Sequence, residues 1–140
     1  MQSNLRRWKI IAHAVSLFFS AAGLVQVYIR EKFGDRPGPI DSDSLAVLKT
    51  ILVFVSAYGL IVVVASLRWR AALLNRLGTR PSRFSPEAGF FLINYPWLVA
   101  PSVYGQLLYF LGLPLRESVY FIATSIVMTL AWAAYDLRTT

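Results

Sequence analysis

The sequence of 140 residues contains no cysteine. Disulfide bonds, thiolate metal sites and cysteine nucleophiles are therefore excluded. Charge is also scarce, because Asp, Glu, Lys and Arg make up only 15% of the chain, whereas soluble domains carry about 25%. Hydrophobic residues make up 56%, and the mean hydropathy is +0.54. This composition disfavours a soluble enzyme, a disordered tail and a secreted disulfide scaffold, and it predicts a protein of the lipid bilayer.

Acidic residues are missing from the middle of every apolar segment, which disfavours a carboxylate-based proton or sodium carrier. The sequence also lacks a zinc-protease motif, a glycine-rich phosphate loop and paired carboxylates at membrane depth. We therefore expect a protein that is not an enzyme and binds no metal. Since His13 is the only histidine, two histidines of one chain cannot ligate a haem. A single haem ligand, or a quinone-binding redox subunit, stays open as an alternative with low support.

Four apolar segments stand out, over residues 10–29, 45–67, 88–115 and 118–135. Each is long enough for a helix that crosses a bilayer of about 30 Å. We predict an all-α integral membrane four-helix bundle that forms a single domain, with helices over about 9–30, 45–77, 86–112 and 114–136. Pro96 and Pro101 each remove a backbone hydrogen bond, so we expect the third helix to be kinked.

Basic residues predict the orientation. The N-terminal tail and the second loop, which contains Arg80 and Arg83, are strongly basic, whereas the first and third loops balance acids and bases. The positive-inside rule then places both termini in the cytoplasm, as in a multi-pass protein of a bacterial inner membrane. The net charge of +7 is read as a topology signal, and we expect no binding of nucleic acid. A cleavable signal peptide is the competing interpretation of the first segment. It is disfavoured because the apolar run continues past the possible cleavage site at residues 20–22.

Two groups of polar residues inside the spans are candidate sites, because polar side chains in a membrane are functional candidates by default. The first group lies at similar depth near the cytoplasmic side: His13, Asn94, Tyr95, Thr129 and Trp132. The second is an outer charge site, formed by Lys49 and Glu117. Each group also has a purely structural interpretation. The first group would form hydrogen bonds between helices. In the second, Lys49 would pair with Glu117 or Asp43, or extend to the headgroups. Small and hydroxylated residues also form stripes, which helix packing alone explains.

The residues Ala100-Pro101-Ser102-Val103-Tyr104-Gly105, followed by Leu107-Leu108 and Gly112, resemble the second hairpin of small bacterial four-helix membrane proteins of unassigned function. The resemblance covers about the last 50 residues and implies a fold only. In those relatives a Glu often precedes the Ala-Pro pair, whereas this chain has Val99. The residue that would suggest proton transfer is therefore missing.

These features favour a non-enzymatic membrane protein that packs against other membrane subunits or copies of itself. It would act as an accessory or assembly subunit, or as a homo-oligomer. The alternative is a small oligomeric channel or transporter that uses the broken third helix around Asn94 and Pro96, with Lys49 at its mouth.

Overall fold

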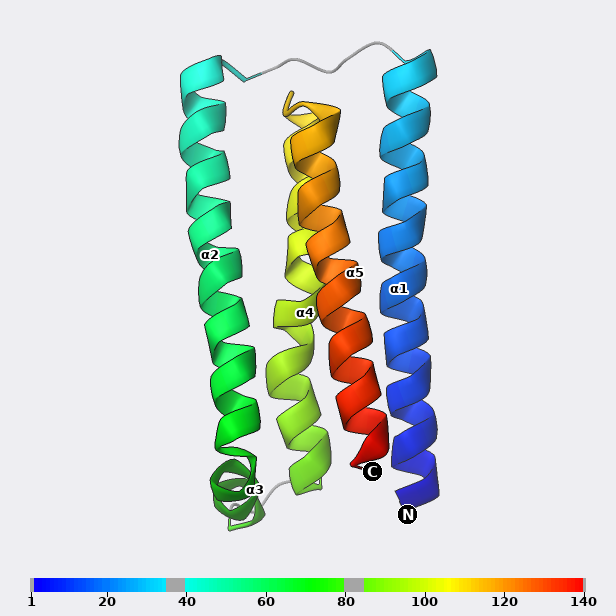
Figure 1. The fold of residues 1–140 in the computed structure, drawn as a ribbon, viewed down its shortest axis with the longest axis vertical. Coiled ribbons are helices and arrows are strands. Elements are labelled where there is room, and N and C mark those ends of the chain that lie inside the picture. The colour runs from blue at the N-terminus through cyan, green and yellow to red at the C-terminus, as the bar shows by residue number, and fades with distance from the viewer. Residues whose placement is uncertain (1, 35–39, 80–84, 140) are drawn as a thin grey trace.

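The computed structural model describes residues 2–34, 40–79 and 85–139, which form five α-helices. These are α1 (Gln2–Phe33), α2 (Ser42–Arg68), α3 (Arg70–Gly78), α4 (Pro86–Phe110) and α5 (Leu115–Arg138). The four long helices lie side by side, and the two ends of the chain lie at the same end of the bundle (Figure 1). The prediction of an all-α chain is confirmed. The helix bounds differ from those expected by three residues or fewer, except at the start of α1, which begins seven residues earlier, and at the end of α2.

The prediction of one continuous helix over 45–77 is wrong, because the helix is interrupted at Trp69, between α2 and α3. Trp69 leaves the helical conformation, with φ −105° and ψ 23°. α3 turns away from the axis of α2, so that Figure 1 shows it nearly end-on. Leu73, Leu74 and Leu77 then pack against the core that contains Phe90. Because no Gly or Pro marks this break, the burial of these leucines explains it better than local propensity.

Local chemistry fixes the other helix ends. The Asp41 carboxylate caps α2 by accepting hydrogen bonds from the backbone N–H and the hydroxyl of Ser44. These bonds, the hydroxyl first, hold the pKa of Asp41 below its usual value. Ser85 caps α4, and Pro86 follows it at the first helical position. α4 ends in a Schellman motif, in which Gly112 has φ 111° and Leu113 N–H donates to Leu108 O.

α4 is the central helix, since it contacts each of the other four described helices. α1 and α2 lie on opposite sides of it and do not contact each other within the described residues. α4 continues through Pro96 and Pro101 as one helix. Figure 1 shows that its ribbon becomes irregular about half-way along. The hydroxyl of Ser125 on α5 donates a hydrogen bond to Leu98 O in this stretch, which supplies a donor where the prolines weaken the helix.

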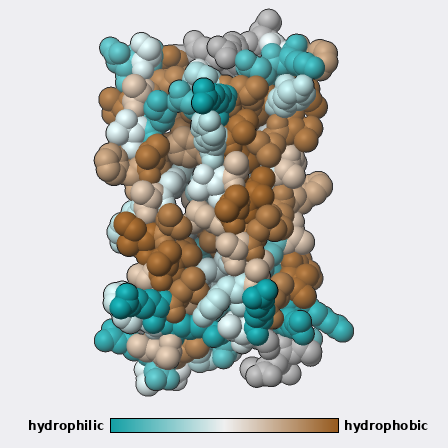
Figure 2. All heavy atoms as spheres, viewed as in Figure 1, coloured by the Kyte–Doolittle hydropathy of each residue, from teal (hydrophilic) through white to brown (hydrophobic). Residues whose placement is uncertain are grey.

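Within the part of the chain that the structure describes, three helices are long and apolar enough to cross a membrane: α1 from Asn4, α2 and α5. α4, with 25 residues, contains two prolines, Asn94 and Gln106. Asn94 and Pro101 are buried against the neighbouring helices, which is where a helix bundle tolerates such residues. Large apolar side chains are exposed along all four long helices. They form a broad apolar zone between two polar ends in Figure 2.

The two ends of the bundle differ in charge. Among the described residues, the end that carries the termini and α3 has seven basic and two acidic side chains: Arg6, Arg7, Lys9, Arg68, Arg70, Arg76 and Arg138 against Glu87 and Asp136. The opposite end has four of each sign: Arg30, Lys32, Lys49 and Arg116 against Glu31, Asp41, Asp43 and Glu117. Arg80 and Arg83, which also entered the orientation argument, lie outside the described residues.

The closest approach of α4 to α5 gives a stability prediction. A Cβ on Gly105 would lie 2.7 Å from Ser118 O and 2.8 Å from Phe121 Cβ, whereas one on Gly89 would only touch Leu77 at 3.4 Å. We expect Gly105→Ala to lower the free energy of unfolding in detergent by about 1–3 kcal/mol, as overpacking does. Gly89→Ala is the matched control and should cause no loss, since Ala favours a helix. Equal stability of the two variants would contradict this packing.

Candidate functional site

The inner face of α1 and that of α5 follow the same spacing. Buried positions alternate by four and three residues in each helix: Lys9, His13, Ser16, Ser20, Gly23 and Val27 in α1, and Ser118, Ile122, Ser125, Thr129, Trp132 and Asp136 in α5. This is the a/d spacing of a coiled-coil seam. The helices run antiparallel, so the start of α1 meets the end of α5. Unlike an ordinary seam, this one is mostly polar.

Lys9 and Asp136 form an ion pair inside the seam. Lys9 Nζ lies 2.8 Å from Asp136 Oδ1, and both side chains are almost fully buried, at 2% and 3% exposed. Lys9 Nζ also lies 5.9 Å from the ring centroid of Phe91 on α4, within the range of a cation–π contact. The pair therefore joins the first and last helices of the chain and touches the central one.

His13 lies one helical turn from Lys9 on the same face of α1. Its Nε2 is 3.6 Å from Asp136 Oδ2, which is beyond hydrogen-bond distance, and neither ring nitrogen makes a hydrogen bond in the described structure. The imidazole packs edge-on against the rings of Phe91, at 5.4 Å, and Tyr95, at 6.4 Å. The ring is thus enclosed between a carboxylate and two aromatic side chains.

The structure divides the five-residue polar group expected from the sequence. His13 and Tyr95 come together, and the Tyr95 hydroxyl donates to Ala12 O on α1 at 2.8 Å. Asn94 faces the other side, where its Oδ1 lies 2.6 Å from Ser66 Oγ of α2 and its Nδ2 donates to Phe90 O. Asn94 therefore connects α4 to α2, and it makes no recorded contact with His13.

The two members of this group on α5 are also separated by their contacts. Trp132 stacks on Phe90, with ring centroids 5.7 Å apart, and so belongs to the hydrophobic core against which the leucines of α3 pack. Thr129 is buried in the seam with α1, and its hydroxyl makes no hydrogen bond in the described structure. The stripes of small and hydroxylated residues on α1 and α5 thus face inward, as packing requires.

The predicted outer charge site is an ion pair. Lys49 Nζ of α2 lies 2.8 Å from Glu117 Oε2 of α5, and the two side chains are 37% and 41% exposed. Because solvent or headgroups reach both groups, this pair contributes much less to stability than a buried one. The geometry matches the purely structural interpretation of Lys49. The ion pair links α2 to α5 at the end of the bundle opposite the termini.

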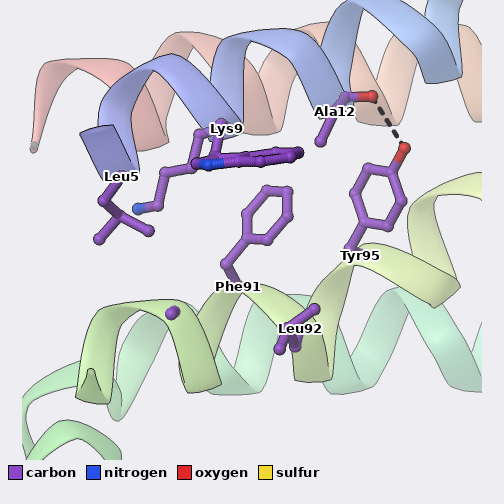
Figure 3. A pocket seen from close by; sticks show the side chains of 8 residues that line it. Leu5, Lys9, Ala12, Phe91, Leu92 and Tyr95 are labelled. Atoms are coloured by element: carbon purple, nitrogen blue, oxygen red, sulfur yellow. Dashed lines mark hydrogen bonds between the residues drawn. The ribbon is translucent and has the colours of Figure 1, made fainter. Parts of the chain in front are cut away.

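A groove opens between α1 and α4 beside the buried ion pair. Its volume is about 430 Å³, within the range of small-molecule sites. Most of the side chains that line the groove are aromatic or aliphatic (Figure 3): Leu5, Trp8, Lys9, Ala12, Ala88, Phe91, Leu92 and Tyr95. Ala12 and Ala88 are small, which leaves space for the groove. Lys9 contributes mainly its carbon chain, because its ammonium group bonds to Asp136.

Lys9 and Asp136 were not among the residues singled out from the sequence. Charges at the ends of apolar segments are typical of headgroup anchors, so they do not by themselves indicate a buried pair. The available signal is the spacing of polar residues, which places Lys9 in line with His13, Ser16 and Ser20. Asp136 lies in line with Trp132 and Thr129 in the same way.

Chemically, the site offers one ion pair, one neighbouring imidazole and an apolar groove. Within the described residues, no three His, Asp or Glu side chains are grouped to hold a metal ion. No family model matches the chain, and no curated protein or solved structure is significantly similar to it. The resemblance of the last hairpin to small bacterial membrane proteins therefore stays a prediction.

The two ion pairs should differ sharply in energy. Removing one partner of a buried pair leaves an uncompensated charge, which costs about 3–5 kcal/mol. We expect Lys9→Met or Asp136→Leu to lower the free energy of unfolding in detergent by this amount. The double variant should lose less than either single change, because no buried charge is left over.

Lys49→Met and Glu117→Leu provide the matched control at the exposed pair. Each should cost less than about 1 kcal/mol. Equal losses at the two pairs would show that Lys9 and Asp136 are solvated rather than buried.

Proposed function

We propose that the chain is an integral membrane protein in which α1, α2, α4 and α5 span the bilayer as a four-helix bundle. The end with both termini and α3 faces the cytoplasm. The charge difference between the two ends supports this orientation. The leucines of α3 pack against the bundle, Arg70 lies over the Phe90 ring and Arg76 is exposed, which suits a helix lying in the cytoplasmic headgroup layer.

Within the membrane, we propose a non-enzymatic role as an accessory or assembly subunit, or as a homo-oligomer. The observation that carries this proposal is a hollow of about 540 Å³ on the outer face of α1, around Ala21 and Ala22. Phe18, Val25 and the exposed amide of Gln26 border it. Small residues allow a second helix to approach closely, and an amide in lipid finds a hydrogen-bond partner only on another helix.

The transport alternative has less support. Asn94, its expected binding residue, is buried and hydrogen-bonded to Ser66 and Phe90. Lys49, its expected mouth, is paired with Glu117. A haem at His13 would have to displace Phe91 or Tyr95 from the imidazole. Asn94 and Lys49 thus each have a structural task that explains their presence.

The orientation is testable because the chain has no native cysteine. Thr139→Cys and Asp43→Cys each introduce a single thiol, at opposite ends of the bundle. In intact cells a membrane-impermeable maleimide should label Asp43→Cys but not Thr139→Cys, and lysis should allow both to react. Labelling of Thr139→Cys alone before lysis would reverse the proposed orientation.

The same approach tests association. Ala21→Cys should form cross-links in native membranes, either to a copy of itself or to a second protein, whereas Ile61→Cys on the exposed face of α2 serves as the control. Gln26→Leu should weaken the association about threefold, the effect of one hydrogen bond between membrane helices. If Ala21→Cys cross-links no more than Ile61→Cys, the proposed interface is wrong.

A further inference from the structure

We propose that the groove between α1 and α4 binds one acyl chain of an anionic phospholipid from the cytoplasmic leaflet. This goes beyond the proposed association and rests only on the membrane location. The groove is nearly all carbon, so it suits a hydrocarbon chain rather than a polar substrate. Its α1 wall runs from Leu5 to Ala12, about 10 Å along the helix axis. It therefore lies parallel to the chains of a bilayer.

The shape of the groove depends on two small residues. Ala12 of α1 and Ala88 of α4 line the groove together with the bulky rings of Trp8, Phe91 and Tyr95, and Figure 3 shows the Phe91 and Tyr95 side chains reaching from α4 toward α1. The Tyr95 hydroxyl closes the inner end by bonding to Ala12 O. The Lys9 ammonium does not turn into the groove as a free charge, because it is bonded to Asp136.

Charge selects the lipid. The groove reaches the end of the bundle at Leu5, next to the exposed Arg6 and Arg7. The described residues of this end have a net charge of +5, from seven basic and two acidic side chains. Asp136, one of the two acids, is paired with Lys9, so its charge is compensated. Glu87 is the second acid at this end. A headgroup above the groove thus meets a positive surface, and each nearby basic residue strengthens the binding of an anionic lipid about fivefold.

The test is native mass spectrometry of the full-length protein, reconstituted with equal amounts of phosphatidylglycerol and phosphatidylcholine and released from detergent. The wild-type protein should retain one phosphatidylglycerol, about 25-fold in excess of phosphatidylcholine, since Arg6 and Arg7 contribute about fivefold each. Equal retention of the two lipids would overturn the proposal. Recovery of the protein in the membrane fraction is checked first. Its absence there would refute the membrane location itself, a failure distinct from that of lipid selection.

Two variants separate shape from charge. Ala12→Leu fills the groove and displaces at least two methylenes of the chain, each contributing about fourfold, so retention of both lipids should fall about fifteenfold. Ala14→Leu, on the exposed side of the same helix and outside both hollows, is the control and should retain lipid normally. The double variant Arg6→Gln, Arg7→Gln should lose phosphatidylglycerol about 25-fold and leave phosphatidylcholine unchanged.

Thermal unfolding followed by circular dichroism verifies that the variants are folded, so that lost lipid is not lost structure. If Ala12→Leu and Ala14→Leu retain the same lipid, the groove is not the site. If Ala12→Leu instead abolishes a dimer that carries no lipid, a second copy occupies the groove. Either result overturns the proposal.

Discussion

The ion pair between Lys9 and Asp136 joins the first helix of the chain to the last. α1 makes no contact with α2, its neighbour in sequence, within the described residues. α1 is therefore positioned by α5 and α4 alone. Two charges at 2.8 Å, with side chains 2% and 3% exposed, set both the register of the antiparallel seam and its closure. Such a pair adds little net stability against an apolar replacement, but wrong registers are penalised because each leaves a buried charge unpaired.

The same constraint explains the polar seam between the ends. Small hydroxyl side chains occupy positions where a soluble coiled coil would have Leu or Ile. In lipid, apolar side chains provide no drive for helix association, so close approach and hydrogen bonds between helices replace it. The two clearest cases lie between α4 and α5, where Gly105 approaches Ser118 and the Ser125 hydroxyl donates to Leu98 O. In the seam itself, the hydroxyls of Ser16, Ser118 and Thr129 make no hydrogen bond in the described structure, so their small size is what allows the close approach. α4 can contain two prolines because its neighbours supply such contacts from several sides.

The sequence predicted the four long helices, because long apolar runs leave few alternatives in chain structure. It did not predict the break at Trp69. The stretch from Ala65 to Leu77 favours helix throughout, and only the tertiary packing of α3 on Phe90 explains the turn. The candidate site was predicted in part. The position of each polar residue along its helix could be predicted from the sequence, but the neighbouring helix that its side chain faces could not. Asn94 and Tyr95 are adjacent in sequence, yet they face opposite helices.

α1 has three tasks that do not compete. Its inner face, from Lys9 to Val27, holds the polar seam. The groove proposed for an acyl chain uses Leu5, Trp8 and Ala12 near the end of the bundle that carries the termini, whereas the outer hollow begins at Phe18, about 9 Å further along the axis. A partner helix on the outer hollow would therefore leave this groove open. Because Lys9 belongs to both the seam and the groove wall, lipid binding and bundle closure share one side chain. Loss of the ion pair would then disturb the groove, while filling the groove at Ala12 would leave the pair intact.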